Sequence, residues 1–461
     1  MKYIATFISK YKYNNFSFDE LVSICEMLKI KNLKIDETFN YDIQHIPYIT
    51  LSFDDIDKPE ICQQIVDRAV LLKNIIKIYS EGDSMDEIIQ NINKDEYKKE
   101  QESTESFKFD VDVRGVTINQ TERLGMMNKF SAFPMKGKVD LTSYQRLFVI
   151  FQNKIINSEK SEIFFGRQIA GKDDKDTRFY TKYDLSHRKY LGPTSTDHIL
   201  AFLMANLAQI KQNDVIIDPF AGTGSLLIPP THYGAFVFGC DLDVRVLKGY
   251  SVGYVRKENK TVKKEADIFT NFDDYGLPRP QIIRQDINHP GVKKNNHVFD
   301  AIICDPPYGY RACSKKTGLS EYKKEKREKR INKKKEEMLK ENENNEENEE
   351  SEEEENEDNK EKDEFNPDYV LYGGEKRLFL PLKKCEVSQI FENLINFAND
   401  SLKKDGILVC LYPTKRTKKE KDLVHLPINF PQHKSFKLLR ACENQYSTLK
   451  SRWCLVYRKI E

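Results

Sequence analysis

The sequence lacks the features that mark membrane, secreted and metal-binding proteins. No stretch reaches the roughly 18 apolar residues that are needed to cross a bilayer, and the opening residues, MKYIATFISKYKYNN, do not resemble a signal peptide. The nine cysteines stand singly and form no Cys-x-x-Cys pair, so neither a zinc site nor a thioredoxin motif is indicated. We therefore expect free thiols, no bound metal, no membrane segment and a reducing, cytoplasmic location.

A net charge of +1 conceals an uneven distribution of charge along the 461 residues. Of the 74 Lys/Arg and 73 Asp/Glu, 14 and 20 respectively lie between residues 315 and 364, so the rest of the chain is modestly basic. That segment contains almost no apolar side chain to bury, and we predict a disordered charged insertion over 314–365. It is either a solvated loop without function or, in its basic half, an arm that helps to hold a polyanion near the site.

Two kinds of secondary-structure pattern divide the chain. Residues 1–160 combine helical and strand periodicities and predict an α+β domain with a loop over polar residues 91–105. After a linker over 161–189, the segment TSTDHILAFLMANLAQI predicts an amphipathic helix capped by Thr or Ser. Short apolar runs alternating with helical stretches then indicate a parallel sheet covered on both faces, closed by a C-terminal antiparallel hairpin. The runs are VIID (215–218), AFVFGCD (235–241), IIRQD (282–286), FDAIICD (299–305) and GILVCLY (406–412).

Three of these runs end in an aspartate, at Asp218, Asp241 and Asp286. Because parallel strands end at one edge of a sheet, where ligands bind, we expect the three carboxylates to lie together there. Gly222 and Gly224 follow the first run and allow a tight turn and a close backbone approach to a ligand, before a helix N-terminus. Each aspartate alone could instead cap a helix, and the glycines could form a structural turn. Asp218 would repel a pyrophosphate but attract the ammonium and sulfonium of S-adenosylmethionine, so the pattern favours that methyl donor.

A fourth run ends in Asp305-Pro306-Pro307-Tyr308. An exocyclic base amine is a poor nucleophile because its lone pair is delocalised into the ring. Asp305 and the Pro306 carbonyl are acceptors that could bind the two N–H groups and direct the lone pair at a methyl group, while the prolines keep the strand end extended. Tyr308 offers a face on which an extruded base can stack. The alternative is a proline-rich loop without a catalytic role.

The segments around these motifs resemble a known family. GPTSTDHILAFLMANLA, DPFAGTGSLLI, FGCDLD, DPPYGYR, PMKGKVDL, FFGRQIA and ACENQYSTLKSRW are similar to stretches of the tRNA (guanine-10-N2) methyltransferase catalytic subunits, which are THUMP-domain-containing class I methyltransferases. The resemblance implies a THUMP-like, tRNA-binding region over 1–160 and a Rossmann-like methyltransferase domain over 190–461 that uses S-adenosylmethionine. It also implies a small zinc-binding activator protein as partner, paired with an edge strand for which IIRQD is the candidate.

The resemblance also implies roles for less conspicuous residues. Tyr190 and Thr194 are expected to line the cofactor pocket, and Pro307 and Arg311 to contact the substrate RNA, although Arg311 is equally well read as a surface residue. His187 and His198 are expected to be structural or surface residues. Two other functions stay open: methylation of N2 of guanine or N6 of adenine at another nucleic-acid position, and RNA binding by a protein that keeps the fold without activity.

Overall fold

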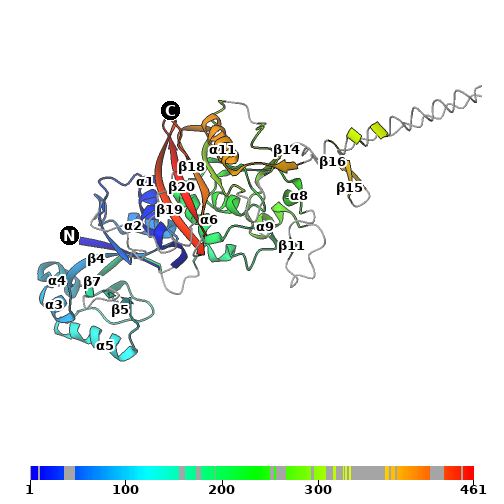
Figure 1. Ribbon diagram of the computed structural model, residues 1–461. Coiled ribbons are helices and arrows are strands. Elements are labelled where there is room, and N and C mark those ends of the chain that lie inside the picture. Colours follow the sequence, from blue (N-terminus) through cyan, green and yellow to red (C-terminus); the bar gives the residue numbers. More distant parts are fainter. Residues whose placement is uncertain are drawn as a thin grey trace, which may run out of the picture.

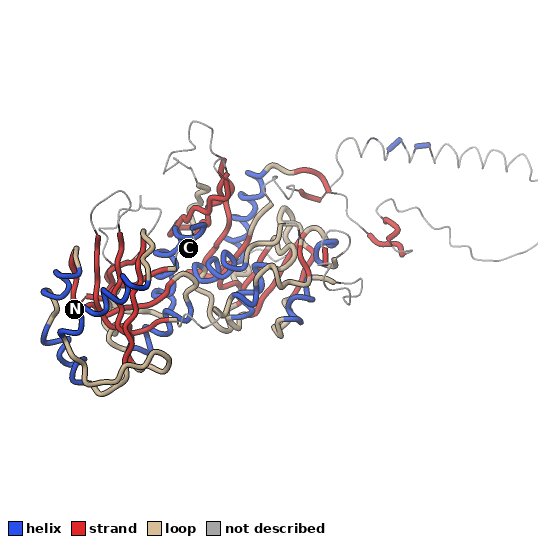
Figure 2. The backbone as a smooth tube through the Cα atoms, turned by 90° about the horizontal axis from the view of Figure 1, so that it is seen from below, coloured by secondary structure: helices blue, strands red, loops and turns tan. Residues whose placement is uncertain are grey.

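A computed structural model describes most of the chain as two seven-stranded sheets with helices packed on them (Figures 1 and 2). The residues described are 2–8, 11–35, 47–154, 161–172, 178–192, 194–249, 254–255, 266–291, 295–307, 315–317, 325, 328–329, 332–333, 369–372, 375–378, 382–415, 430–447 and 450–461. Among them, no helix combines the length and apolar character that crossing a membrane requires. Most of the predicted insertion over 314–365, together with Tyr308 and Arg311, lies outside the described residues.

The N-terminal sheet has the strand order β2-β3-β1-β4-β7-β6-β5, and only the β5–β6 pair is parallel. Its strands are β1 (Lys2–Phe7), β2 (Lys34–Ile35), β3 (Tyr48–Ser52), β4 (Leu72–Gly82), β5 (Phe107–Arg114), β6 (Arg146–Lys154) and β7 (Ser161–Gly171). Its helices are η1 (Tyr11–Phe16), α1 (Ser17–Met27), α2 (Pro59–Arg68), α3 (Met85–Gln90), α4 (Lys94–Glu102), α5 (Gln120–Asn128) and η2 (Lys129–Ala132). The α+β prediction is confirmed, while β7 belongs to this sheet although its residues fall in the predicted linker.

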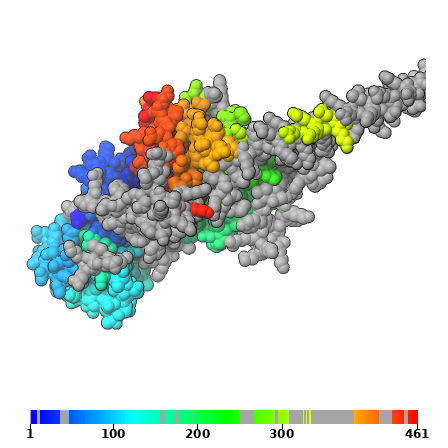
Figure 3. All heavy atoms as spheres, in the orientation of Figure 1, coloured from blue at the N-terminus to red at the C-terminus, as the bar shows by residue number. Residues whose placement is uncertain are grey.

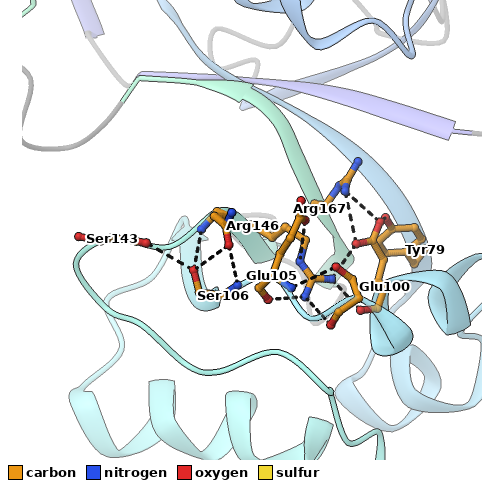
Figure 4. Close-up of polar contacts among 9 residues, drawn as sticks. Tyr79, Glu100, Glu105, Ser106, Ser143, Arg146 and Arg167 are labelled. Carbon is orange, nitrogen blue, oxygen red and sulfur yellow. Dashed lines mark hydrogen bonds and ion pairs between the residues drawn. The ribbon is translucent and has the colours of Figure 1, made fainter.

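The loop predicted over residues 91–105 is wrong, because α4 occupies most of it. The Asn93 side chain caps the helix by accepting a hydrogen bond from the Glu96 N–H at 3.2 Å. Glu100 then anchors the helix to the sheet, because it forms ion pairs of 3.2 Å with both Arg146 and Arg167. It also accepts a hydrogen bond from the hydroxyl of Tyr79 on β4 (Figure 4). The helix is polar in sequence, and these charge pairs keep it in place together with its one buried ring, Tyr97, which packs on aromatic side chains of the sheet.

The C-terminal sheet has the order β12-β10-β9-β13-β18-β20-β19, and β20 runs antiparallel to both of its neighbours. Its strands are β9 (Val215–Asp218), β10 (Phe236–Asp241), β12 (Gln281–Arg284), β13 (Phe299–Cys304), β18 (Leu402–Lys415), β19 (Phe436–Ser447) and β20 (Lys450–Lys459). All five predicted apolar runs are strands, and the predicted hairpin is β19–β20. The strand from IIRQD is β12, at the predicted edge.

Side-chain alternation divides this sheet between two layers of helices. Ile217, Ile302 and Leu408 face α11 (Val387–Ser401), whereas their chain neighbours pack on the opposite face. That opposite face is covered by α6 (His198–Leu207), η4 (Ser225–Leu227), α7 (Ile228–His232) and α9 (Ile268–Asp274). The sequence prediction for α6 needs two corrections: Asp197 is its cap, and nearly all of its residues are buried because other helices cover its outer side.

The N-terminal region packs directly on the C-terminal sheet and its helices. α1 lies against α6, and η1 lies against β19. Arg440 on β19 forms ion pairs with Glu26, at 2.7 Å, and with Asp19, at 3.5 Å, both on α1. Figure 3 shows the blue N-terminal residues beside the red and orange C-terminal strands. A continuous apolar core therefore joins the two sheets along α1, α2 and α6.

Candidate active site

Four aspartates follow the carboxyl ends of four neighbouring strands. Asp218 ends β9, Asp241 ends β10, Asp286 comes two residues after β12, and Asp305 directly follows β13. The strand order β12-β10-β9-β13 places all four at one edge of the sheet, which is where the sequence predicts them. Parallel strands bring together residues that are up to 87 positions apart in the chain, counted from Asp218 to Asp305.

The glycine loop between β9 and η4 is held against Asp241. Gly222 and Gly224 have φ values of +52° and +82°, a region that residues with a Cβ rarely adopt. The Gly222 N–H donates to Asp241 Oδ2 at 2.9 Å. A Cβ on Gly224 would lie 2.9 Å from Ile268 Cγ1, whereas one on Gly222 would have only the Phe220 carbonyl oxygen nearby, at 3.9 Å. Packing therefore requires glycine at 224, and the space beside Gly222 is available to a ligand.

The helix expected after this loop is much shorter than a typical helix. η4 covers Ser225–Leu227 and α7 only Ile228–His232, with Pro229 and Pro230 in its first turn. The donor groups that face the strand ends thus belong to the loop rather than to a long helix.

Burial makes two of the strand-end carboxylates, Asp218 and Asp241, unusually basic. Burial raises the pKa of Asp218 well above its usual value, and the nearby carboxylates of Asp241 and Asp305 raise it further. Burial likewise raises the pKa of Asp241 to about 6. Asp286 is buried and accepts hydrogen bonds from the Asn288 backbone at 2.9 Å and side chain at 2.6 Å. Several closely spaced acids in a buried position favour a ligand that carries positive charge.

Asp305 is held by side chains from two other elements. Arg452 on β20 forms an ion pair of 3.1 Å with Asp305 Oδ2, and Thr196 Oγ1 lies 3.5 Å from the same oxygen. Pro306 is buried and Pro307 half-buried directly after it. Neither Arg452 nor Thr196 was predicted, because no local pattern shows that a residue on β20 reaches the end of β13.

The segment before α6 approaches the glycine loop. Thr194 itself is exposed, but its neighbour Ser195 forms hydrogen bonds with the Gly192 N–H at 2.9 Å and with the Thr223 hydroxyl at 2.8 Å. Tyr190 is buried and donates its hydroxyl hydrogen to the Val246 carbonyl at 2.5 Å. This segment therefore lies beside the glycine loop.

The two histidines fit the structural roles expected for them. His198 is buried, with Nδ1 3.5 Å from the carboxylate of Asp184, and His187 is exposed. Across the described ranges, no group of three or more His, Cys, Asp or Glu side chains could hold a metal ion.

Comparisons with known proteins agree with this arrangement. Residues 1–173 match the family model described as the Tmrp11 THUMP N-terminal domain, and residues 186–252 match the RMKL-like methyltransferase domain. The chain is 27% identical over 456 residues to tRNA (guanine(10)-N(2))-methyltransferase TRMT11 of Pongo abelii, covering 97% of this chain and 86% of that protein. It is 30% identical over 351 residues to the protein of the same name from Dictyostelium discoideum, covering 70% of this chain and 65% of that protein.

A solved structure, TrmN from Thermus thermophilus, aligns over 100% of both chains with 14% identity and a TM-score of 0.40. The C-terminal sheet has the strand order of a Rossmann-like methyltransferase, and the methyltransferase family match falls within the same domain.

Proposed function

This chain belongs to the THUMP-domain-containing methyltransferases, and we propose that it transfers a methyl group from S-adenosylmethionine to N2 of guanine 10 in tRNA. The observation that carries the proposal is the position of Asp305, which follows β13 beside buried Asp218 at the end of β9 and half-buried Asp241 at the end of β10. The likeness to proteins named for this reaction supports the choice of substrate. An N-terminal THUMP region supports an RNA rather than a DNA substrate.

The buried acids fit the proposed cofactor. Asp218 would meet its ammonium group, Asp241 its ribose hydroxyls, and Asp286 would complete the acidic edge. Gly222 and Gly224 would let the loop backbone approach it, with Thr194 alongside. When bound, S-adenosylmethionine supplies a methyl group on a positively charged sulfur. The raised pKa values of Asp218 and Asp241 support this assignment, because a cation would relieve the electrostatic cost of the buried carboxylates.

The remaining residues would bind and orient the base. Asp305 and the Pro306 carbonyl would accept the two N–H groups of the target amine, so that its lone pair points at the methyl group. As the bond from N2 to the methyl carbon forms, the bond from that carbon to sulfur would break and S-adenosylhomocysteine would leave, while the amine loses one proton, which the Asp305 carboxylate would accept. Tyr308 would stack on the extruded base, and Pro307 and Arg311 would line the substrate side.

Methyl transfer to tRNA in vitro tests the proposal. Labelled S-adenosylmethionine would be incubated with this protein, co-expressed with its proposed activator protein, in two reactions. One contains unmodified tRNA, and the other contains a tRNA in which guanine 10 is replaced by adenine. We expect label only in the first. Asp305→Asn should lower kcat by about 100-fold or more. Asp300→Asn is a matched control, because Asp300 pairs with Lys403 at the opposite end of the same strand.

Each other outcome has a distinct meaning. Label in both RNAs would retain the methyltransferase and move its target to another guanine or adenine. Label in neither RNA, with tRNA binding intact, would favour an inactive RNA-binding protein.

We also propose a small zinc-binding activator protein as partner, docked on β12. Among the described strands β12 is the outer one of its sheet, so one of its edges pairs with none of them and is suited to strand addition. Ile283 on β12 and Phe236 at the start of β10 are 42% and 62% exposed. Ile283→Lys should reduce co-purification of the activator, whereas Leu124→Lys, at an exposed apolar position on α5, should not.

A reducing compartment such as the cytoplasm is part of this proposal. Eight cysteines lie in described segments, and all eight are free thiols, most of them buried. Unpaired buried cysteines are typical of proteins that fold where disulfides do not persist.

A further inference from the structure

The carboxylate of Asp305 is held from two strands away. Its ion-pair partner, Arg452, lies on β20, and β18 separates β20 from β13. Cys304 is opposite Cys410 on β18, and Arg452 is opposite Pro413 on the same strand. With strands about 4.8 Å apart, the backbones of β13 and β20 are about 10 Å apart, a distance that an arginine side chain can span. The guanidinium thus reaches across the end of β18 to the edge of the sheet where the four aspartates lie.

Several described neighbours of Asp305 are negative or neutral groups. Asp218 on β9 is close enough for each carboxylate to influence the other. Burial raises the pKa of the Cys410 thiol to about 12 and holds the pKa values of Cys304 and Cys454 well above the usual range, so these neighbours stay neutral. The pKa of Tyr13, near Arg452, is also raised by burial. Arg452 brings a positive charge into direct contact with the Asp305 carboxylate.

We propose that Arg452 is a positioning residue for methyl transfer: it keeps Asp305 ionised and fixes the plane of its carboxylate toward the target amine. This inference rests on the proposed function. A carboxylate has about four lone-pair sites, so a bond to Arg452 leaves capacity for the N–H groups of the base. A protonated Asp305 would instead present an O–H donor to the amine, so it would hold its share of the N–H groups less well and could not take up the released proton.

The geometry favours this role over a structural one. Arg452 and Asp305 side chains are each only 17% exposed, so their attraction is weakly screened by solvent. Thr196 lies near the same carboxylate oxygen as Arg452, which restricts rotation of the carboxylate about its Cβ–Cγ bond. Both contacts act on the oxygen Oδ2, and together they set the direction of Oδ1.

Kinetics of Arg452 variants test the proposal. The variants are Arg452→Met and Arg452→Lys, with kcat and KM for tRNA measured from pH 5 to 9. Arg452→Met should lower kcat at pH 7 by about 100-fold, change KM for tRNA by less than about 3-fold, and move the acid limb of the kcat profile to higher pH. Arg452→Lys should restore part of kcat. Arg458→Met is a matched control, since Arg458 is also on β20 but pairs with Glu26 at 3.4 Å, and it should retain wild-type kcat.

Two results would overturn this role. A raised KM for tRNA with unchanged kcat would mean that Arg452 contacts the RNA backbone instead. An unchanged pH profile of kcat in Arg452→Met would mean that it does not control the charge of Asp305.

A measurement without substrate separates this inference from the proposed function. Removing Arg452 should raise the pKa of folded Asp305, so the Tm deficit of Arg452→Met should be larger at pH 8 than at pH 5. The pH dependence of that deficit should vanish when Asp305 is replaced by Asn. Wild-type protein that methylates no RNA would refute the proposed function, whereas a deficit that does not vary with pH would refute the action of Arg452 on Asp305.

Discussion

Glu20 is buried where the N-terminal region meets the methyltransferase domain, and its replacement should reveal how strongly the two are joined. Its Oε1 accepts hydrogen bonds from the Val70 N–H and from Asn206 Nδ2, both at 2.7 Å. Its Oε2 accepts one from the Leu71 N–H at 2.9 Å. Asn206 on α6 also accepts a hydrogen bond of 2.8 Å from Arg68. One carboxylate therefore ties α1, the turn after α2, and α6.

The cost of losing this carboxylate follows from the three donors. A hydrogen bond to a charged group contributes about 1.5–3 kcal/mol, and each buried donor left without a partner costs about 1–3 kcal/mol. These contributions do not add fully, and burial, which raises the pKa of Glu20, already opposes its charge. We expect Glu20→Ala to lower the free energy of unfolding by about 3–5 kcal/mol. Glu20→Gln should cost about 1–3 kcal/mol, because its amide would turn a donor toward a backbone N–H.

Urea unfolding would measure this effect with two probes. Trp453, the single tryptophan, reports on β20, while far-ultraviolet circular dichroism reports on both domains. In Glu20→Ala the two transitions should separate, because the N-terminal region loses the buried carboxylate that joins α1 to α6. Glu26→Gln is the control: it lies on the same helix with 39% of its side chain exposed and should cost about 1 kcal/mol or less. If Glu20→Gln lowered the free energy of unfolding no more than Glu26→Gln does, the buried hydrogen bonds of Glu20 would not be what joins the two regions.

Two other changes test the cofactor loop. Burial raises the pKa of Asp241 from 3.8 to about 6. The protonated carboxyl group therefore stabilises the fold fully below pH 3.8, and this stabilisation, about 3 kcal/mol, is lost as the pH rises through about 6. The stability of Asp241→Asn relative to wild type should therefore increase between pH 4 and pH 7 in thermal unfolding, and wild-type affinity for S-adenosylmethionine should weaken below about pH 6 in calorimetry. Gly224→Ala should destabilise by about 2–4 kcal/mol through its φ of +82° and its contact with Ile268, whereas Gly276→Ala, with a φ of +65° and nothing within 4 Å, should cost about 1 kcal/mol in the same assay. Equal losses would show that backbone conformation alone, not packing against Ile268, requires glycine at 224.

The sequence predicts those parts of the fold that depend on local pattern. Apolar runs that end in acids identify β9, β10 and β13, because both the burial of a strand and the turn after it are written in adjacent residues. The local sequence does not single out the cap of α6, because four consecutive residues are good capping residues: Thr194, Ser195, Thr196 and Asp197. Asp197 is the one used, and it also accepts a hydrogen bond of 2.9 Å from Tyr13 in the N-terminal region. That choice depends on tertiary contacts.

Charged partners that are distant in the chain leave no sign in the local sequence. α4 is stabilised by Arg146, which is 46 residues away from Glu100, and a polar window of sequence carries no sign of that partner. Arg452 reaches Asp305 across β18, although the two are 147 positions apart in the chain. Both omissions concern charged side chains whose partners are set by strand order. Motif reading therefore finds the acids of a site more readily than the cations that control them.

The position of Tyr13 connects these contacts to the proposed choice of nucleotide. Its hydroxyl donates to Asp197, the residue after Thr196, and Thr196 in turn lies near Asp305. Glu20 and the Arg440 ion pairs hold the same N-terminal segment on α6 and β19. If the N-terminal region binds tRNA as proposed, these contacts hold it at a constant distance from Asp305. A constant distance would select one nucleotide of a folded tRNA by its position, which explains how a site that recognises only an exocyclic amine could act on a single guanine.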